Sequence, residues 1–189
     1  MLLTHTLLEM GVSAAMDYVE ALLCLLFQIG ESVRTKIQKV MYFASQKGLI
    51  EDTFIPHYYG PYSREVADTT ESLVSIGFLR EDMRFFREGM GYRYSLTEDG
   101  KLILEDMIST KISAENYDEL SKLAEICKDA TPILLSIAAK VHFILRQKSE
   151  PMNPEQICEH AKGLNWEITS EQIESACELL KKLTLIEQE

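Results

Sequence analysis

Apolar residues recur at helical spacing along most of the chain. Over residues 13–29 they occupy one face of a helix that Gly30 is placed to end. A second helix is predicted over 32–47, and a third over 63–76 with Ser63 as its N-cap. The three predicted inward faces are Val19, Leu22, Leu23, Leu26 and Phe27; Ile37, Val40, Met41 and Ala44; and Val66, Thr70, Leu73 and Val74.

The hydrophobic period changes from 3.6 to 2 after Gly77. Residues 78–81 and 92–97 alternate as strands do, and the Glu-Gly-Met-Gly run at 88–91 predicts the turn between them. Thr97 is placed to cap a following helix. Three helices followed by a hairpin are the order of a winged helix-turn-helix, so we predict such a domain, with an N-terminal helix, over residues 1–110.

The remaining residues, 111–189, predict a helical C-terminal domain. Its helices begin at about Asn116 and after capping signals at Thr131, Asn153 and Thr169. Residues 72–81 also align with 179–188, which suggests an internal repeat. This half is either a truncated helix-turn-helix without a wing or an ordinary helical domain with a short tail. The fold class is therefore mostly α with a small β-hairpin wing.

The charge of the chain limits the partners it suits. Its 189 residues include 19 Lys and Arg against 30 Asp and Glu, a net charge of -11. This argues against non-specific binding to nucleic acid or an anionic membrane, but it allows a local basic patch. The most apolar run, residues 21–30, is shorter than the roughly 20 residues of a spanning helix. The N-terminus lacks a basic signal-peptide region, so we expect a cytoplasmic protein.

Signatures of catalysis and metal binding are missing from the sequence. It contains no GxSxG, GxxxxGK[ST], GxGxxG or HExxH motif. Cys158 and His160 have no second ligand pair at metal spacing, and Cys24, Cys127 and Cys177 lie among apolar residues, as buried cysteines do. We therefore predict no enzymatic activity, no metal and no cofactor.

Three segments carry a resemblance to a known family. They are TKIQKVMYFA at 35–44, HYYGPYS at 57–63 and YRYSLTEDG at 92–100. Together they resemble the YwgA-like and Panacea-type domains of prokaryotes, over about residues 15–110. The resemblance implies a winged-helix-like domain of regulators and antitoxin-like proteins, and it implies no catalysis. Residues 111–189 have no counterpart in it, and the acidic charge departs from a simple DNA binder.

The HYYGPYS segment has two interpretations. In the first, the tyrosine rings fill the gap between the second and third helices while Gly60 and Pro61 set the turn. In the second, Tyr59, Tyr62 and their neighbours form a surface that binds a phosphate, a base or a peptide. Lys36 and Lys39 on the second helix are likewise either solvated or contacts to phosphate.

The predicted wing is the most basic window of the chain. Arg84, Arg87 and Arg93 stand there against Glu88, and Arg80 lies just before it. Wing arginines commonly contact the phosphate backbone or the minor groove, so these four are the predicted nucleic-acid contacts. The predicted recognition helix offers Arg64 as a contact, but its three acids make it a poor reader of the major groove: Glu65, Asp68 and Glu71.

Two functions follow from these observations. One is a DNA-binding transcriptional regulator or antitoxin-like regulatory protein that contacts double-stranded DNA through its wing. The other is a protein–protein interaction module on the same scaffold, without DNA binding. We also expect a homodimer, because an apolar N-terminal segment would otherwise form an exposed patch, unless it docks within its own chain. Its apolar residues are Leu2, Leu3, Leu7, Leu8 and Met10.

Overall fold

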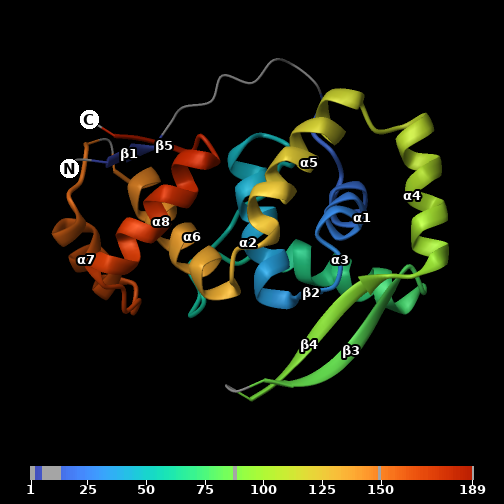
Figure 1. The fold of residues 1–189 in the computed structure, drawn as a ribbon, viewed down its shortest axis with the longest axis horizontal. Coiled ribbons are helices and arrows are strands. Elements are labelled where there is room, and N and C mark those ends of the chain that lie inside the picture. Colours follow the sequence, from blue (N-terminus) through green and yellow to red (C-terminus); the bar gives the residue numbers. More distant parts are fainter. Residues whose placement is uncertain (1–2, 6–13, 87–88, 149, 189) are drawn as a thin grey trace.

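The computed structural model describes residues 3–5, 14–86, 89–148 and 150–188. It confirms a mostly helical chain with two small antiparallel sheets (Figure 1). The helices are α1 Tyr18–Ile29, α2 Arg34–Gln46, α3 Arg64–Ser75, α4 Glu98–Thr110, α5 Ala114–Lys128, α6 Pro132–Arg146, α7 Pro154–Gly163 and α8 Ser170–Lys182. The strands are β1 Leu3–His5, β2 Ser32–Val33, β3 Leu79–Phe86, β4 Gly89–Leu96 and β5 Ile186–Gln188.

Side-chain caps fix where the helices begin. The predicted caps are confirmed, since each accepts a hydrogen bond from a first-turn N–H: Ser63, Thr97, Thr131, Asn153 and Thr169. Helix α1 begins at Tyr18 rather than near Ser13, because Asp17 and Glu20 form a capping box there.

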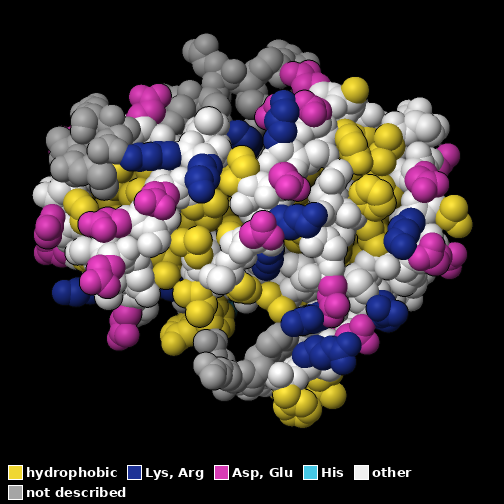
Figure 2. Space-filling model, in the orientation of Figure 1, with side chains coloured by type: hydrophobic (Ala, Val, Ile, Leu, Met, Phe, Trp, Pro, Cys, Tyr) yellow, Lys and Arg dark blue, Asp and Glu magenta, His cyan; other side chains and the backbone are white. Residues whose placement is uncertain are grey.

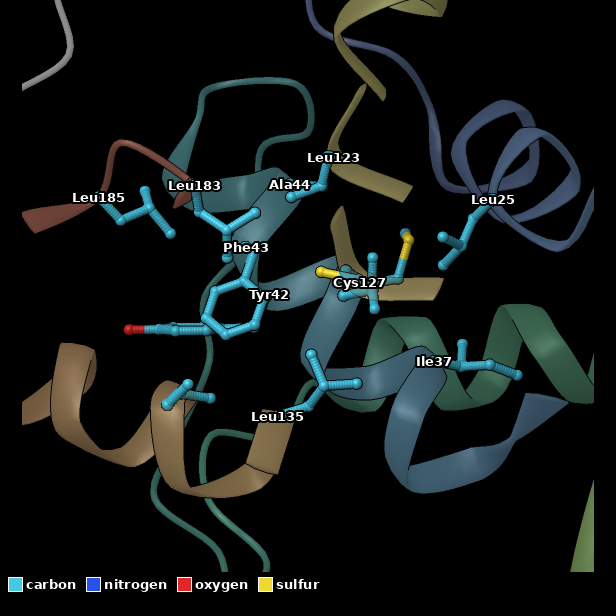
Figure 3. Close-up of a cluster of buried hydrophobic side chains, with 14 of the residues drawn as sticks. Leu25, Ile37, Tyr42, Phe43, Ala44, Leu123, Cys127, Leu135, Leu183 and Leu185 are labelled. Carbon is cyan, nitrogen blue, oxygen red and sulfur yellow. The ribbon is translucent and has the colours of Figure 1, made fainter. Parts of the chain in front are cut away.

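One hydrophobic core joins the two predicted halves. Helix α2 lies at its centre, and Figure 3 shows Tyr42 and Phe43 of α2 among Cys127 of α5 and Leu135 of α6. Helix α5 packs on α1, and α6 packs on α2. The core is therefore continuous across residue 110, and the division into two domains stays a prediction.

Helix α1 is buried on all sides along part of its length. All residues from Ala21 to Leu26 are buried, so it has no polar face over this stretch. Phe27, predicted to face inward, is instead 48% exposed. In the part of the chain that the structure describes, no helix has the length and apolar character needed to cross a membrane.

The hairpin is longer than predicted. Residues 89–91, which we expected in the turn, belong to β4, because Met90 and Tyr92 pair across the ladder with Phe85 and Met83. The sheet has the order β2-β4-β3, and β2 contributes only Ser32 and Val33, which pair with Tyr94 and Arg93. In Figure 1 the hairpin extends beyond the body of the molecule, below α2 and β2.

The predicted repeat is visible in the backbone conformation after α3 and after α8. Gly77 after α3 and Thr184 after α8 both have positive φ, 85° and 56°. In the same alignment β3 begins at Leu79 and β5 at Ile186. Among the described residues after α8, β5 pairs antiparallel with β1. The N-terminal strand thus lies beside β5 as β4 lies beside β3.

The position of β1 changes the argument for a dimer. Leu3 is fully buried within its own chain and forms a β-bridge with Met152. The prediction that Leu3 contributes to an exposed apolar patch is therefore wrong. The other four residues of that argument lie outside the described residues: Leu2, Leu7, Leu8 and Met10.

Candidate functional site

Side chains of α2 hold the segment His57–Ser63 in place. Gln38 donates to the Ser63 carbonyl at 2.8 Å and accepts from the Ser63 N–H at 2.9 Å. The Lys39 ammonium donates to the Pro61 carbonyl at 2.6 Å. These side chains of one helix therefore anchor the turn.

The C-terminal half holds the same segment from the other side. Ser136 of α6 donates its hydroxyl to the Tyr59 carbonyl at 2.6 Å, and the Trp166 indole donates to the His57 carbonyl at 2.7 Å. Gly60 has φ 95°, and a Cβ there would lie 3.2 Å from the Ser136 carbonyl oxygen. The turn needs glycine for both reasons, and it joins the two halves of the fold.

Neither lysine of α2 is fully solvated, although solvation was one of the two alternatives predicted for them. Lys39 is 2% exposed. Burial, with repulsion from Lys140, lowers the pKa of Lys39 to about 7. Lys36 is half-buried; its ammonium donates to the carbonyls of Lys128 and Ala130 at the end of α5, and burial lowers its pKa. Both ammonium groups are therefore bonded within the chain.

The tyrosines of the turn do not fill the gap between α2 and α3, so that interpretation is wrong for two of them. Tyr58 is 71% exposed and Tyr59 is 54% exposed, and their rings meet edge to face with centroids 4.8 Å apart. Tyr62 is half-buried beside the His57 ring, at 5.3 Å between centroids. Backbone bonding, rather than these rings, positions the turn, which leaves two aromatic side chains at the surface.

Tyr59 lies at the floor of a groove between the hairpin and α6. It is lined by residues 89–92 of β4, by residues 33–35 at the start of α2, and by Thr131 with the first two residues of α6, around a cavity of about 580 Å³. A second hollow, of about 390 Å³, shares Tyr59 and Ile133 and continues to Lys140. We call the two hollows together the α6 groove. Figure 2 shows the surface hollowed beside the hairpin, with hydrophobic side chains next to the hollow.

Arg34 fixes the hairpin to α2 at the edge of this groove. Its guanidinium donates to the Tyr94 hydroxyl at 2.7 Å and lies 5.8 Å from the centre of the Tyr92 ring. It also lies 3.6 Å from Glu71 and 3.9 Å from Glu81. Burial acts to lower the pKa of Arg34, but the bond to Tyr94 and the two carboxylates raise it overall. This cation is therefore already matched by acids.

The hairpin has most of its charged side chains on one face and most of its apolar side chains on the other, where Glu81 is the charged exception. Its register places Arg80, Arg84 and Arg93 on one face, as the wing prediction requires, together with Asp82. Met83, Phe85, Met90 and Tyr92 share the other face and are 55%, 85%, 60% and 37% exposed. The hairpin therefore offers an apolar surface as well as a basic one.

Acidic residues interrupt the basic face. Arg80 pairs with Asp82 at 3.0 Å, and Arg93 pairs with Glu31 at 3.4 Å. Arg84 is exposed and forms no ion pair with a residue that the structure describes. Arg87 lies outside the described residues. Of the four predicted contacts, three are thus brought onto one face, but two of these are paired with acids.

The exposed side of α3 is acidic. Arg64, a predicted contact, is paired with Asp68 of the next turn at 3.4 Å. Glu65 and Glu71 are exposed on the same helix. The surface that a recognition helix would turn to DNA therefore has more negative than positive charge.

Sequence reasoning missed the α6 wall of the groove. Ile133 lies in the first turn of α6 and is 58% exposed. The available signal was the number of apolar residues on this helix, which exceeds what one inward face needs. Lys140 gave no signal, since its position depends on segments distant in sequence.

Part of the chain is similar to a bacterial protein. It is 38% identical over 73 residues to the uncharacterized protein YwgA of Bacillus subtilis. The match covers 38% of this chain and 44% of that protein, so the chain spans less than half of the relative's length. No family model matches the chain.

Proposed function

We propose that the chain is a regulatory protein-interaction module on a winged-helix scaffold. The order α1, β2, α2, α3, β3, β4 and the strand order β2-β4-β3 support the scaffold. The α6 groove carries the functional part of the proposal, because it presents exposed Tyr59, Ile133 and Met90 around one cavity. Exposed apolar and aromatic side chains gathered in a concave site are typical of protein-binding surfaces.

Electrostatics favours a protein partner over DNA. The net charge of -11 and the acidic exposed side of α3 repel phosphates. Lys36 and Lys39 bond to carbonyl groups within the chain, so they do not add to a basic surface.

A comparison of two probes tests this function. Random peptides displayed on phage are selected on the wild type and on Ile133→Asp, whose side chain is exposed and tolerates the change. We expect peptides enriched on the wild type alone. Fluorescence anisotropy with a short mixed-sequence duplex at roughly 150 mM salt is expected to detect no binding. Tight duplex binding without any enriched peptide would reverse the assignment.

DNA contact through the wing is the second candidate. Arg80, Arg84 and Arg93 on one face of the hairpin favour it. Such contact would rest on the phosphate backbone, because α3 offers little to base edges. Weak sequence discrimination and a marked salt dependence are its expected signs.

The homodimer remains part of the proposal. Its support is now the exposed apolar face of the hairpin, which includes Met83 and Phe85, rather than Leu3. Light scattering at micromolar concentration tests it, since a species of 21.6 kDa alone would exclude a stable dimer.

A further inference from the structure

Strand β4 has an edge that is only half covered. It runs from Gly89 to Leu96, but β2 pairs with no more of it than Arg93 and Tyr94. Beyond Val33 the chain turns into α2, so residues 89–92 line the α6 groove, and no strand of the described residues pairs with them on that side.

The backbone groups of this edge can be assigned from the ladder. The Thr97 N–H donates to the Phe78 carbonyl across the β3 side. Because backbone groups of an antiparallel strand alternate between its two sides, residues 95, 93, 91 and 89 also turn toward β3. Met90 and Tyr92 then direct their N–H and C=O groups into the groove. An unpaired edge of this kind is a template for another strand.

The two edges of the sheet differ in protection. The outer edge strand, β3, carries Arg80, Asp82 and Arg84, and charged residues of this kind discourage strand addition. The open part of β4 reads Gly-Met-Gly-Tyr and has no charge. Gly89 and Gly91 leave room for a second backbone to approach.

We propose that the α6 groove binds an extended peptide segment of a partner protein, which adds as a strand to β4 beside Met90 and Tyr92 and places an acidic side chain near Lys140. This inference rests on the proposed protein-interaction function and names its partner class. Thr131, Pro132 and Ile133 line the same groove as the open edge, so a partner must enter this groove to reach the edge, which suits one strand rather than the sheet of a second copy. Tyr59 and Ile133 provide apolar contacts for alternate side chains of the peptide.

The positive charge of Lys140 is the reason to expect an acidic residue in the peptide. Lys140 lies two turns along α6 from Ile133, about 10 Å away. Its ammonium lies 5.6 Å from the centre of the Trp166 ring and forms no ion pair with a carboxylate of a described residue. Lys39 lies close enough to repel it, and Glu167 is the one acid among the described residues that line the same hollow. A peptide carboxylate would therefore find an unmatched ammonium here.

Proline substitutions test the strand addition. Met90→Pro removes an N–H that faces the groove and leaves the β3–β4 ladder intact, while Met90→Ala removes only the side chain. Phe85→Pro is the matched control, because Phe85 pairs with Met90 but turns its N–H to the opposite edge. For a peptide selected on the wild type, we expect Met90→Pro to weaken binding about tenfold or more, and the other two by less than about threefold. Thermal melts confirm that all variants fold.

Chemical variants of the selected peptide complete the test. Methylation of its backbone nitrogens, one at a time, is expected to weaken binding at alternate positions. Lys140→Glu is expected to weaken binding about tenfold, and replacing the peptide's acid by lysine is expected to restore it.

Three other outcomes would overturn the inference, and each has a different consequence for the proposed function. Peptides that bind equally to wild type and Met90→Pro, with no alternation, exclude strand addition but leave the protein-interaction function standing. A self-association that Met90→Pro abolishes would make the occupant a second copy. If no peptide prefers the wild type to Ile133→Asp, both proposals are wrong.

Discussion

Replacing Lys39 by methionine is expected to change how stability depends on pH. Lys39 is buried, and its pKa is lowered to about 7 in the folded chain, against an ordinary value of 10.5. Between these two values the unfolded chain binds a proton that the folded chain does not. The free energy of unfolding of the wild type therefore gains a term that rises with pH, and Lys39→Met lacks this term.

The size of the effect follows from the two pKa values. Each pH unit between them is worth at most about 1.4 kcal/mol, and from pH 7 to pH 9 the term amounts to about 2 kcal/mol. The Pro61 carbonyl loses its donor in the variant, which costs about 1 kcal/mol at every pH. Only the pH-dependent part of the difference reports the titration of Lys39.

Denaturant unfolding of both proteins at pH 6, 7, 8 and 9 measures the difference. The variant is expected to lose stability relative to the wild type as the pH rises above 7, and to level off below it. Lys162→Met at an exposed position of α7 controls for removing a lysine from the surface. A difference that stays constant from pH 6 to pH 9 would refute the reasoning, because the bond to Pro61 would then keep the ammonium charged.

Three further predictions concern the turn, the wing and the groove. Gly60→Ala is expected to lower the unfolding free energy by roughly 1–3 kcal/mol, seen as a lower Tm, because φ is positive and a backbone carbonyl blocks the Cβ; an unchanged Tm would contradict this. If the wing contacts DNA, replacing Arg84, Arg87 and Arg93 by alanine is expected to lower the salt slope by about 0.9 per lost phosphate contact, and equal slopes would place the contact elsewhere. Ile133→Asp is expected to keep the wild-type Tm within about 2 °C, since the side chain is exposed; a larger loss would show that Ile133 supports the core.

Local signals in the sequence predicted most of the fold. Ser63, Thr97 and Thr131 were identified as caps because a cap depends on residues within one turn. The hairpin turn was misplaced, since the pairing of Met90 with Phe85 is a cross-strand contact that glycines on either side obscure.

The candidate site was less predictable than the fold. In the sequence Lys39 resembles a surface lysine. Its burial depends on the contact with Pro61 and on α6, which is about 100 residues away. The groove beside Ile133 likewise needs residues 89–92, which are about 40 positions away in the sequence. Arg80, Arg84 and Arg93 of the predicted wing lie on one face of the hairpin, but Glu31, which pairs with Arg93, comes from a distant segment.

Trp166, the single tryptophan of the chain, makes the protein its own fluorescent reporter. The indole is buried against Phe143, bonded to the His57 carbonyl and adjacent to the Lys140 ammonium. Release of the turn would expose the ring to water and shift its emission to longer wavelength, whereas a ligand that draws Lys140 away would change its intensity. Undocking of the turn and occupation of the groove are thus separable in one spectrum, without any label.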